Sequence, residues 1–138
     1  MTTHYTTEWC IEKRVLRLVV NSQFLTIDDM REINHDLTQC IHFGEPPFVH
    51  TIIDCRGIEK FQMNLPSIQQ VLTFLREPLM GWLLIVSDDK LIGFVASLVT
   101  QLAGVRFRTF HTSDDAWVFL NSVDETLTVI PDTLTDTP

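Results

Sequence analysis

The chain has 138 residues and a net charge of −8 at neutral pH. This length corresponds to about one domain, and a content of 45% hydrophobic and 20% charged residues is typical of a globular protein, not of a disordered one. The negative charge argues against a nucleic acid as partner, because phosphates would be repelled.

The sequence also predicts where the protein resides. The first residues, M-T-T-H-Y-T-T-E-W, lack a basic segment followed by an apolar core, so we expect no signal peptide. The longest apolar run, residues 91–105, contains several Gly, Ser, Thr and Gln residues. It is shorter than the ~20 residues that a membrane span needs. We therefore expect a soluble, cytoplasmic protein without a membrane span.

The first half of the chain predicts a hairpin, a helix and a further strand. Strands are expected in three apolar runs, Tyr5–Ile11, Val15–Val20 and 48–54. Thr26 opens the helix, with Asp29 in the position of a capping box, and residues 44–47 (G-E-P-P) end it. The residues that recur at helical spacing and should face the core are Ile27, Met30, Ile33, Leu37, Cys40 and Ile41.

The second half alternates helices and strands. A second helix is expected around Ile68, Val71, Leu72 and Leu75, with Pro66 in its first turn. A strand at 82–86 follows, and then a third helix at Lys90–Ala103, capped by 87–89 and ended by Gly104. The last strand is expected at 105–110. Thr112 caps a final helix whose inward residues are Ala116, Phe119, Leu120 and Val123.

This alternation predicts an α/β fold: a mostly parallel sheet of four to five strands with an N-terminal hairpin and four helices. We expect one domain over residues 1–123. Residues 124–138 form a polar tail rich in Thr, Asp and Pro, whose end, residues 132–138, is expected to be disordered.

Two features predict a surface for a ligand or a partner. The helix Lys90–Ala103 is apolar over about 200° of its circumference, wider than the ~100° stripe that one-sided packing needs. Its polar remainder carries no charge. Such a helix is either a central helix packed between two others or makes a further contact with a dimer partner or an apolar ligand, because wide uncharged apolar faces are typical of interfaces. On the last strand Arg106 and Arg108 point to one side, which indicates an ordinary solvated face or an anion or partner site. The candidate surface residues are Phe94, Ser97, Leu98, Gln101, Arg106 and Arg108.

The sequence contains no strong catalytic motif and predicts no cofactor. The three cysteines, Cys10, Cys40 and Cys55, include no C-x-x-C pair, so free thiols are expected. The histidines are not at metal-ligand spacing relative to the cysteines, and no metal site is predicted. The acid pairs 88–89 and 114–115 precede helices, where helix capping explains them.

The order of elements resembles the STAS-type fold of anti-sigma-factor antagonists and sulfate-transporter tails, and that of small bacterial STAS/SEC14-like proteins. The stretch I-I-D-C-R-G-I is similar to the family's apolar strand followed by Asp, two residues and Gly. G-W-L-L-I-V-S resembles its next strand, and R-F-R-T-F-H-T-S-D-D-A-W-V-F-L its closing strand and last helix. The likeness extends from Val15 to Val123 and implies the fold.

The turn after the stretch I-I-D-C-R-G-I departs from the switching members of the family, which place D-S-[ST]-G a few residues after the Gly. Counting from Gly57, the matching positions are Gln62, Met63, Asn64 and Leu65, so the phosphoacceptor hydroxyl is absent. Ser67 is the nearest hydroxyl and a displaced candidate acceptor. Asn64 is better explained as a helix cap, and Asp54 and Gly57 as the framework of a turn.

Three hypotheses follow. The first is a non-catalytic interaction or regulatory module without a phosphorylation switch, forming a homodimer. The second, which follows the SEC14-like resemblance and the apolar helix, is a binding protein for a small apolar or lipid-like ligand. The third is an enzyme with Asp54 as its acid, which requires a second polar group within hydrogen-bond reach in a cleft.

Overall fold

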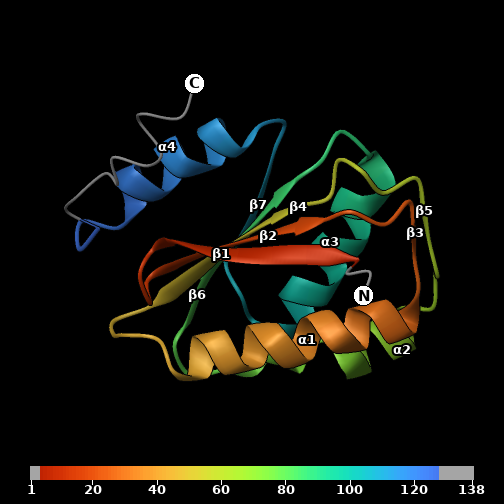
Figure 1. The fold of residues 1–138 in the computed structure, drawn as a ribbon, viewed down its shortest axis with the longest axis horizontal. Coiled ribbons are helices and arrows are strands. Elements are labelled where there is room, and N and C mark those ends of the chain that lie inside the picture. Colours follow the sequence, from red (N-terminus) through yellow and green to blue (C-terminus); the bar gives the residue numbers. More distant parts are fainter. Residues whose placement is uncertain (1–3, 128–138) are drawn as a thin grey trace.

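A five-stranded sheet forms the centre of the protein (Figure 1) in this computed structural model, which describes residues 4–127. The strand order is β1-β2-β4-β6-β7. β1 runs antiparallel to β2, and all other neighbours are parallel, as the alternation of strands and helices predicts. The strands are β1 (Tyr5–Ile11), β2 (Val15–Val20), β4 (Val49–Asp54), β6 (Met80–Val86) and β7 (Phe107–Phe110).

Helices cover both faces of this sheet. Their bounds are α1 (Ile27–His42), α2 (Leu65–Val71), the 3-10 helix η1 (Thr73–Arg76), α3 (Lys90–Ala103) and α4 (Ser113–Val123). Residues of α1, α2, η1 and α3 share one core cluster with one side of the sheet, whereas α4 packs with the other side. Figure 1 shows α4 on the opposite side of the strands from α1 and α2.

The register divides the strand residues between these two layers. Leu16 and Leu18 of β2 belong to the cluster under α1–α3, and Val15 belongs to the cluster under α4. On β4, Ile53 faces α1–α3 and Ile52 faces α4. This alternation is the period of two that a strand imposes, and because both faces are covered, most residues of the inner strands are apolar.

The helix caps predicted from sequence are present. Thr26 and Asp29 form a reciprocal capping box at α1, and Asp89 accepts a hydrogen bond from the Leu91 amide at 2.8 Å. Thr112 accepts from the Asp115 amide at 3.1 Å. Gly104 ends α3 with φ 73°, a left-handed conformation that favours glycine.

The structure differs from the sequence-based expectations in several elements. The second helix is divided into α2 and η1, since Leu72 interrupts it with ψ 63°. A small parallel sheet, β3 (Phe24–Leu25) with β5 (Lys60–Phe61), was not predicted because each strand has two residues.

The ends of the chain give two further differences. In α4, Trp117 is buried and Val123 is 42% exposed, so the prediction that Val123 faces the core is wrong. Asp124 and Leu127, from the start of the predicted tail, are bonded to or packed against the domain. The predicted disordered end, residues 132–138, lies outside the described residues.

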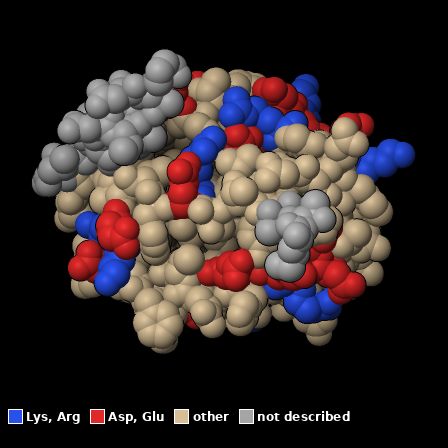
Figure 2. Space-filling view, in the orientation of Figure 1, with Lys and Arg blue, Asp and Glu red and all other residues tan. Residues whose placement is uncertain are grey.

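On the face drawn in Figure 2, Lys and Arg side chains lie among those of Asp and Glu. None of the helices within residues 4–127 is long and apolar enough to cross a membrane.

Candidate functional site

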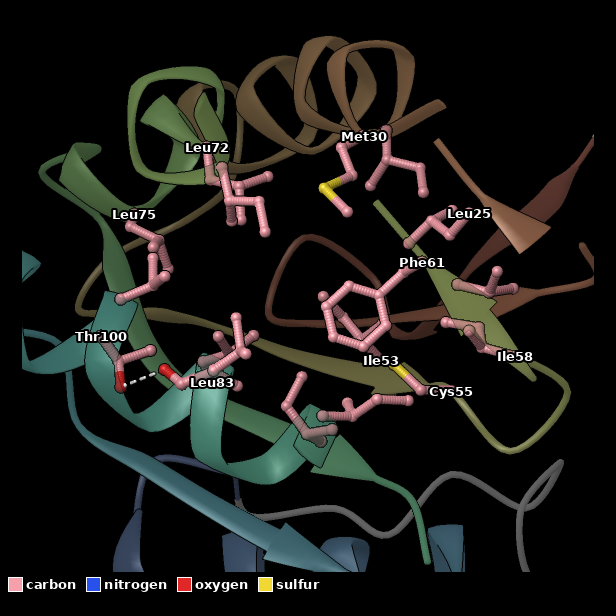
Figure 3. Close-up of a pocket in the computed structure, with 18 of the residues that line it drawn as sticks. Leu25, Met30, Ile53, Cys55, Ile58, Phe61, Leu72, Leu75, Leu83 and Thr100 are labelled. Atoms are coloured by element: carbon pink, nitrogen blue, oxygen red, sulfur yellow. Dashed lines mark hydrogen bonds between the residues drawn. The ribbon is translucent and has the colours of Figure 1, made fainter. Parts of the chain in front are cut away.

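An apolar cavity of about 130 Å³ lies between the sheet and the layer of α1, α2, η1 and α3 (Figure 3). Leu25, Ile58 and Phe61 border it on the side of the small β3–β5 sheet, opposite Leu72 and Leu75 in Figure 3. The remaining lining residues come from β2, α1, β4 and the residue after it, α2, η1, β6 and α3: Val20, Met30, Ile33, Ile53, Cys55, Ile68, Phe74, Leu83, Ile85, Ile92, Val95, Ala96, Val99 and Thr100.

The cavity offers a ligand neither a charge nor a free polar group. Its one hydroxyl, that of Thr100, donates to the carbonyl oxygens of Ala96 at 2.8 Å and Ser97 at 3.1 Å. The other heteroatoms are sulfurs. Burial, followed by the charge of Asp54, raises the pKa of the Cys55 thiol to about 12, so the thiol is neutral. Recognition in this cavity therefore depends on shape and apolar contact.

The four candidate surface residues on α3 lie outside this cavity. Phe94 is 60% exposed, Gln101 is exposed, and Ser97 and Leu98 are half-buried. The cavity side of α3 is instead formed by Ile92, Val95, Ala96, Val99 and Thr100. Thr100, although polar, is only 1% exposed and belongs to this inner side. The wide apolar arc of α3 thus has two adjoining parts, an inner one that lines the cavity and an outer one that is exposed.

Arg106 and Arg108 lie on the other face of the sheet. The Arg106 guanidinium lies over the rings of Phe48 and Trp82, at 5.1 and 5.4 Å from their centroids. That of Arg108 lies 4.9 Å from the centroid of the Phe119 ring on α4. The structure therefore does not bring these arginines together with the candidate residues on α3. Their contacts are cation–π interactions at a partly exposed aromatic surface.

Asp54, at the carboxyl end of β4, is buried and fully engaged by arginines. Its Oδ1 accepts from the backbone amide and Nε of Arg56, both at 3.0 Å, and its Oδ2 accepts from Nη2 of Arg56 at 2.6 Å. Arg17 Nη2 lies 3.7 Å from Oδ2. Although burial raises the pKa of Asp54, the hydrogen bonds from Arg56 and the charge of Arg17 hold it below its usual value. Such a carboxylate stays ionised, and it does not line the apolar cavity.

The remaining switch positions form the turn and the start of α2. A Cβ on Gly57 would lie 3.2 Å from the carbonyl oxygen of Val20, so this glycine permits a close approach to β2. Met63 is 51% exposed. Asn64 caps α2 and accepts from the Ser67 amide at 3.1 Å, as the sequence predicts.

A buried polar network was missed by the sequence analysis. His50 is 1% exposed, and its Nδ1 accepts from the Trp82 amide at 2.9 Å. Its Nε2 lies 2.6 Å from Oδ2 of Asp124, which also accepts from Arg14 at 3.2 Å. Both ring nitrogens are therefore used, and the imidazole has no free nitrogen for catalysis. The partners are 74 residues apart in sequence, a separation at which local patterns carry no signal.

The described residues contain no group of three or more His, Cys, Asp or Glu side chains that could hold a metal ion. The three cysteines are free, as expected.

A search against protein-family models and a search of curated proteins find no match to the sequence. Among solved structures, the chain is similar to an uncharacterized protein from the DUF3478 family with a SpoIIAA-like fold, from Shewanella loihica PV-4. The two align with a TM-score of 0.61 and 15% sequence identity, over 84% of this chain and 91% of that chain. The chain therefore has the SpoIIAA-like fold, which is the STAS-type fold that its motifs predict.

Proposed function

We propose that this protein is a non-catalytic binding module on a STAS-type scaffold, and that it holds a small apolar molecule in the cavity beneath α1, α2 and α3. The observation that carries the proposal is the cavity of about 130 Å³ with its apolar lining. The turn supports a role without the family's switch, because Met63 and Asn64 stand where the phosphoacceptor would be.

The energetic cost of an empty cavity favours a ligand. Unfilled apolar volume within a core costs about 24 cal/mol per Å³ in core-truncation series, so filling such volume stabilises a fold. Binding an apolar molecule would recover dispersion contacts that the lining residues lack.

The volume also limits the class of ligand. Apolar cavities of about 150 Å³ stay dry and bind molecules such as benzene or xenon, whereas sites for drug-sized ligands have ~300–1,000 Å³. The cavity therefore suits an uncharged monocyclic or short-chain molecule, and a long lipid chain would require it to expand. Thr100 gives no orientation to a polar group, since its hydroxyl is bonded within α3.

The test is a titration of the ¹⁵N-labelled protein with benzene, in which binding is detected through changes in the amide chemical shifts. We expect shifts at cavity residues such as Ile53 and Ile85, with a Kd of about 0.1–1 mM, equivalent to ~4–5.5 kcal/mol. Val95→Phe, which fills the cavity, should abolish them, and Ala96→Leu should weaken them. Val118→Phe, at a 67% exposed position of α4, is the matched control.

Two results would reject the cavity as the site: no shifts at saturating benzene or xenon, or binding that persists in a folded Val95→Phe protein. Native mass spectrometry of the freshly purified wild type then reports whether a natural ligand is retained. A mass above that of the chain, lost in Val95→Phe, would identify its size.

The second candidate function is a protein-interaction module. It is favoured by the outer face of α3, where Leu91, Phe94 and Leu102 are 48%, 60% and 62% exposed. Large apolar side chains gathered on one helix face are typical of interaction surfaces. Arg106 and Arg108 stay a separate predicted partner surface, on the opposite side of the sheet.

A further inference from the structure

We propose that the outer face of α3 is the interface of a homodimer in which two α3 helices pack antiparallel across a two-fold axis. The face, named the α3 stripe, consists of Leu91, Phe94, Leu98 and Leu102. The proposal rests on the second candidate function, the interaction module, and does not depend on a ligand in the cavity.

The α3 stripe is continuous and exposed. At 100° per residue its four positions fall within an arc of about 80°, which adjoins the cavity-facing side of α3, and none of the four lines the cavity. Three of its side chains are 48–62% exposed, and Leu98 between them is half-buried. Burying them against a partner would remove apolar surface from water, which is worth about 25 cal/mol per Å².

The spacing of the α3 stripe favours a second copy as the partner. An isologous interface requires a surface that is complementary to itself after a two-fold rotation. The stripe is nearly symmetric about its midpoint near Ala96. An antiparallel copy places Leu91 against Leu102 and Phe94 against Leu98, so apolar side chains meet along the whole contact.

The distribution of charge favours self-association through this face. Two copies with a net charge of −8 each repel one another. Residues 91–105 contain no charged side chain, and Ser97 and Gln101, beside the stripe, are neutral. The stripe itself therefore adds no repulsion between the copies.

A membrane surface fits this face less well than a second copy does. Helices that lie on membranes carry Lys and Arg on their polar face, and these contact anionic lipids. α3 has one basic residue, Lys90 at its first position, and the chain as a whole is acidic.

The size of the α3 stripe predicts a dimer of moderate affinity. A standard interface buries about 800 Å² per partner, more than four side chains of one helix supply. We expect a Kd of about 10–100 μM. Sedimentation equilibrium of the full chain from micromolar to millimolar concentration should show an average mass that rises from monomer to dimer.

Substitutions test the location of the interface. Phe94→Asp should weaken the dimer at least 10-fold, and Val118→Asp, at an equally exposed position on α4, should leave it unchanged. A wild type that remains monomeric at millimolar concentration would overturn the proposal, as would a dimer that Phe94→Asp does not weaken. Cavity occupation is measured separately by Val95→Phe, so failure of one proposal is distinguishable from failure of the other.

The antiparallel arrangement has its own test. Leu91→Lys and Leu102→Glu should each weaken the dimer. The double variant should recover affinity, because the introduced ammonium of each copy would pair with the introduced carboxylate of the other. A double variant as weak as the single variants would contradict this arrangement. If the monomer binds vesicles of phosphatidylcholine or phosphatidylserine instead, and Phe94→Asp abolishes that binding, the face is a membrane surface and the homodimer is rejected.

Discussion

His50 is a histidine that the fold holds neutral. Burial is the main cause that lowers its pKa, and the charges of Arg14 and Arg106 add to it, whereas the hydrogen bond to Asp124 opposes them. The geometry agrees with a neutral ring, because Nδ1 needs its lone pair to accept from the Trp82 amide. Nε2 is then the nitrogen that carries the proton and donates it to Asp124.

This assignment predicts how stability changes with pH. The unfolded chain takes up a proton on this histidine below pH ~6.5, while the folded protein does not. The unfolded state therefore binds more protons, and stability falls as pH decreases from about 6.5 toward the lowered pKa, by up to ~1.4 kcal/mol per pH unit. Although burial raises the pKa of Asp124, hydrogen bonds from Thr126 and His50 hold it below its usual value. Protonation of Asp124 at more acidic pH therefore lowers the stability of the fold further.

The measurement is urea unfolding of His50→Gln between pH 7.5 and 5. We expect the variant to lose about 1–3 kcal/mol at pH 7, since the Trp82 amide and Asp124 lose a partner, and to show a shallower fall in stability with decreasing pH. His35→Gln, at an exposed position of α1, is the control. A wild-type slope in His50→Gln would show that the histidine does not cause the pH dependence.

Short-range contacts of single residues were predictable, and long-range ones were not. Thr26, Asn64 and Thr112 could be assigned as caps because each bonds an amide three residues away. The contact between His50 and Asp124 depends on where α4 ends relative to β4, which only the folded chain determines.

At the scale of elements, prediction succeeded where the repeat was long. α3 was predicted with its observed bounds, because 14 residues of apolar sequence stand between a capping acid and a glycine. It failed for α2 and η1, which together span residues 65–76 and resemble one amphipathic helix in sequence. Prediction also failed for Trp117, which was not assigned to the core. The side of α4 that faces the sheet includes Trp117 and does not include Val123.

The capping box of α1 provides a prediction at this scale. Thr26 Oγ1 accepts from the Asp29 amide at 3.0 Å, and Asp29 Oδ2 accepts from the Thr26 amide at 3.0 Å. Thr26→Ala should lower the free energy of unfolding by about 0.5–2 kcal/mol, as measured by urea denaturation at pH 7.

Thr38→Ala, a change of the same type within α1, is the control for this cap. Its side chain makes only a 3.5 Å contact with Asn34, so it should cost less. Equal losses from the two variants would mean that the capping box has no special contribution to α1.

At the scale of the whole molecule, the sequence predicted the sheet and the surplus of apolar surface on α3, but not the cavity. The cavity is the space left after 19 side chains from strands and helices have packed, and no pattern along the chain encodes such a space. Its lining also includes Leu25 of β3 and Phe61 of β5, whose two-residue strands were not predictable.

The net charge of −8 gives the last prediction, which concerns the effect of salt on the homodimer. The Debye length falls from ~30 Å at 0.01 M to ~8 Å at 0.15 M, so salt screens the repulsion between two acidic copies. An interface formed by the uncharged α3 stripe loses nothing by that screening. NaCl from 0.01 to 0.3 M should therefore tighten the dimer about 3- to 10-fold, whereas an interface held by ion pairs would weaken. Sedimentation equilibrium distinguishes the two, and the Phe94→Asp dimer should stay at least 10-fold weaker than the wild-type dimer at every salt concentration, which excludes non-specific association in salt.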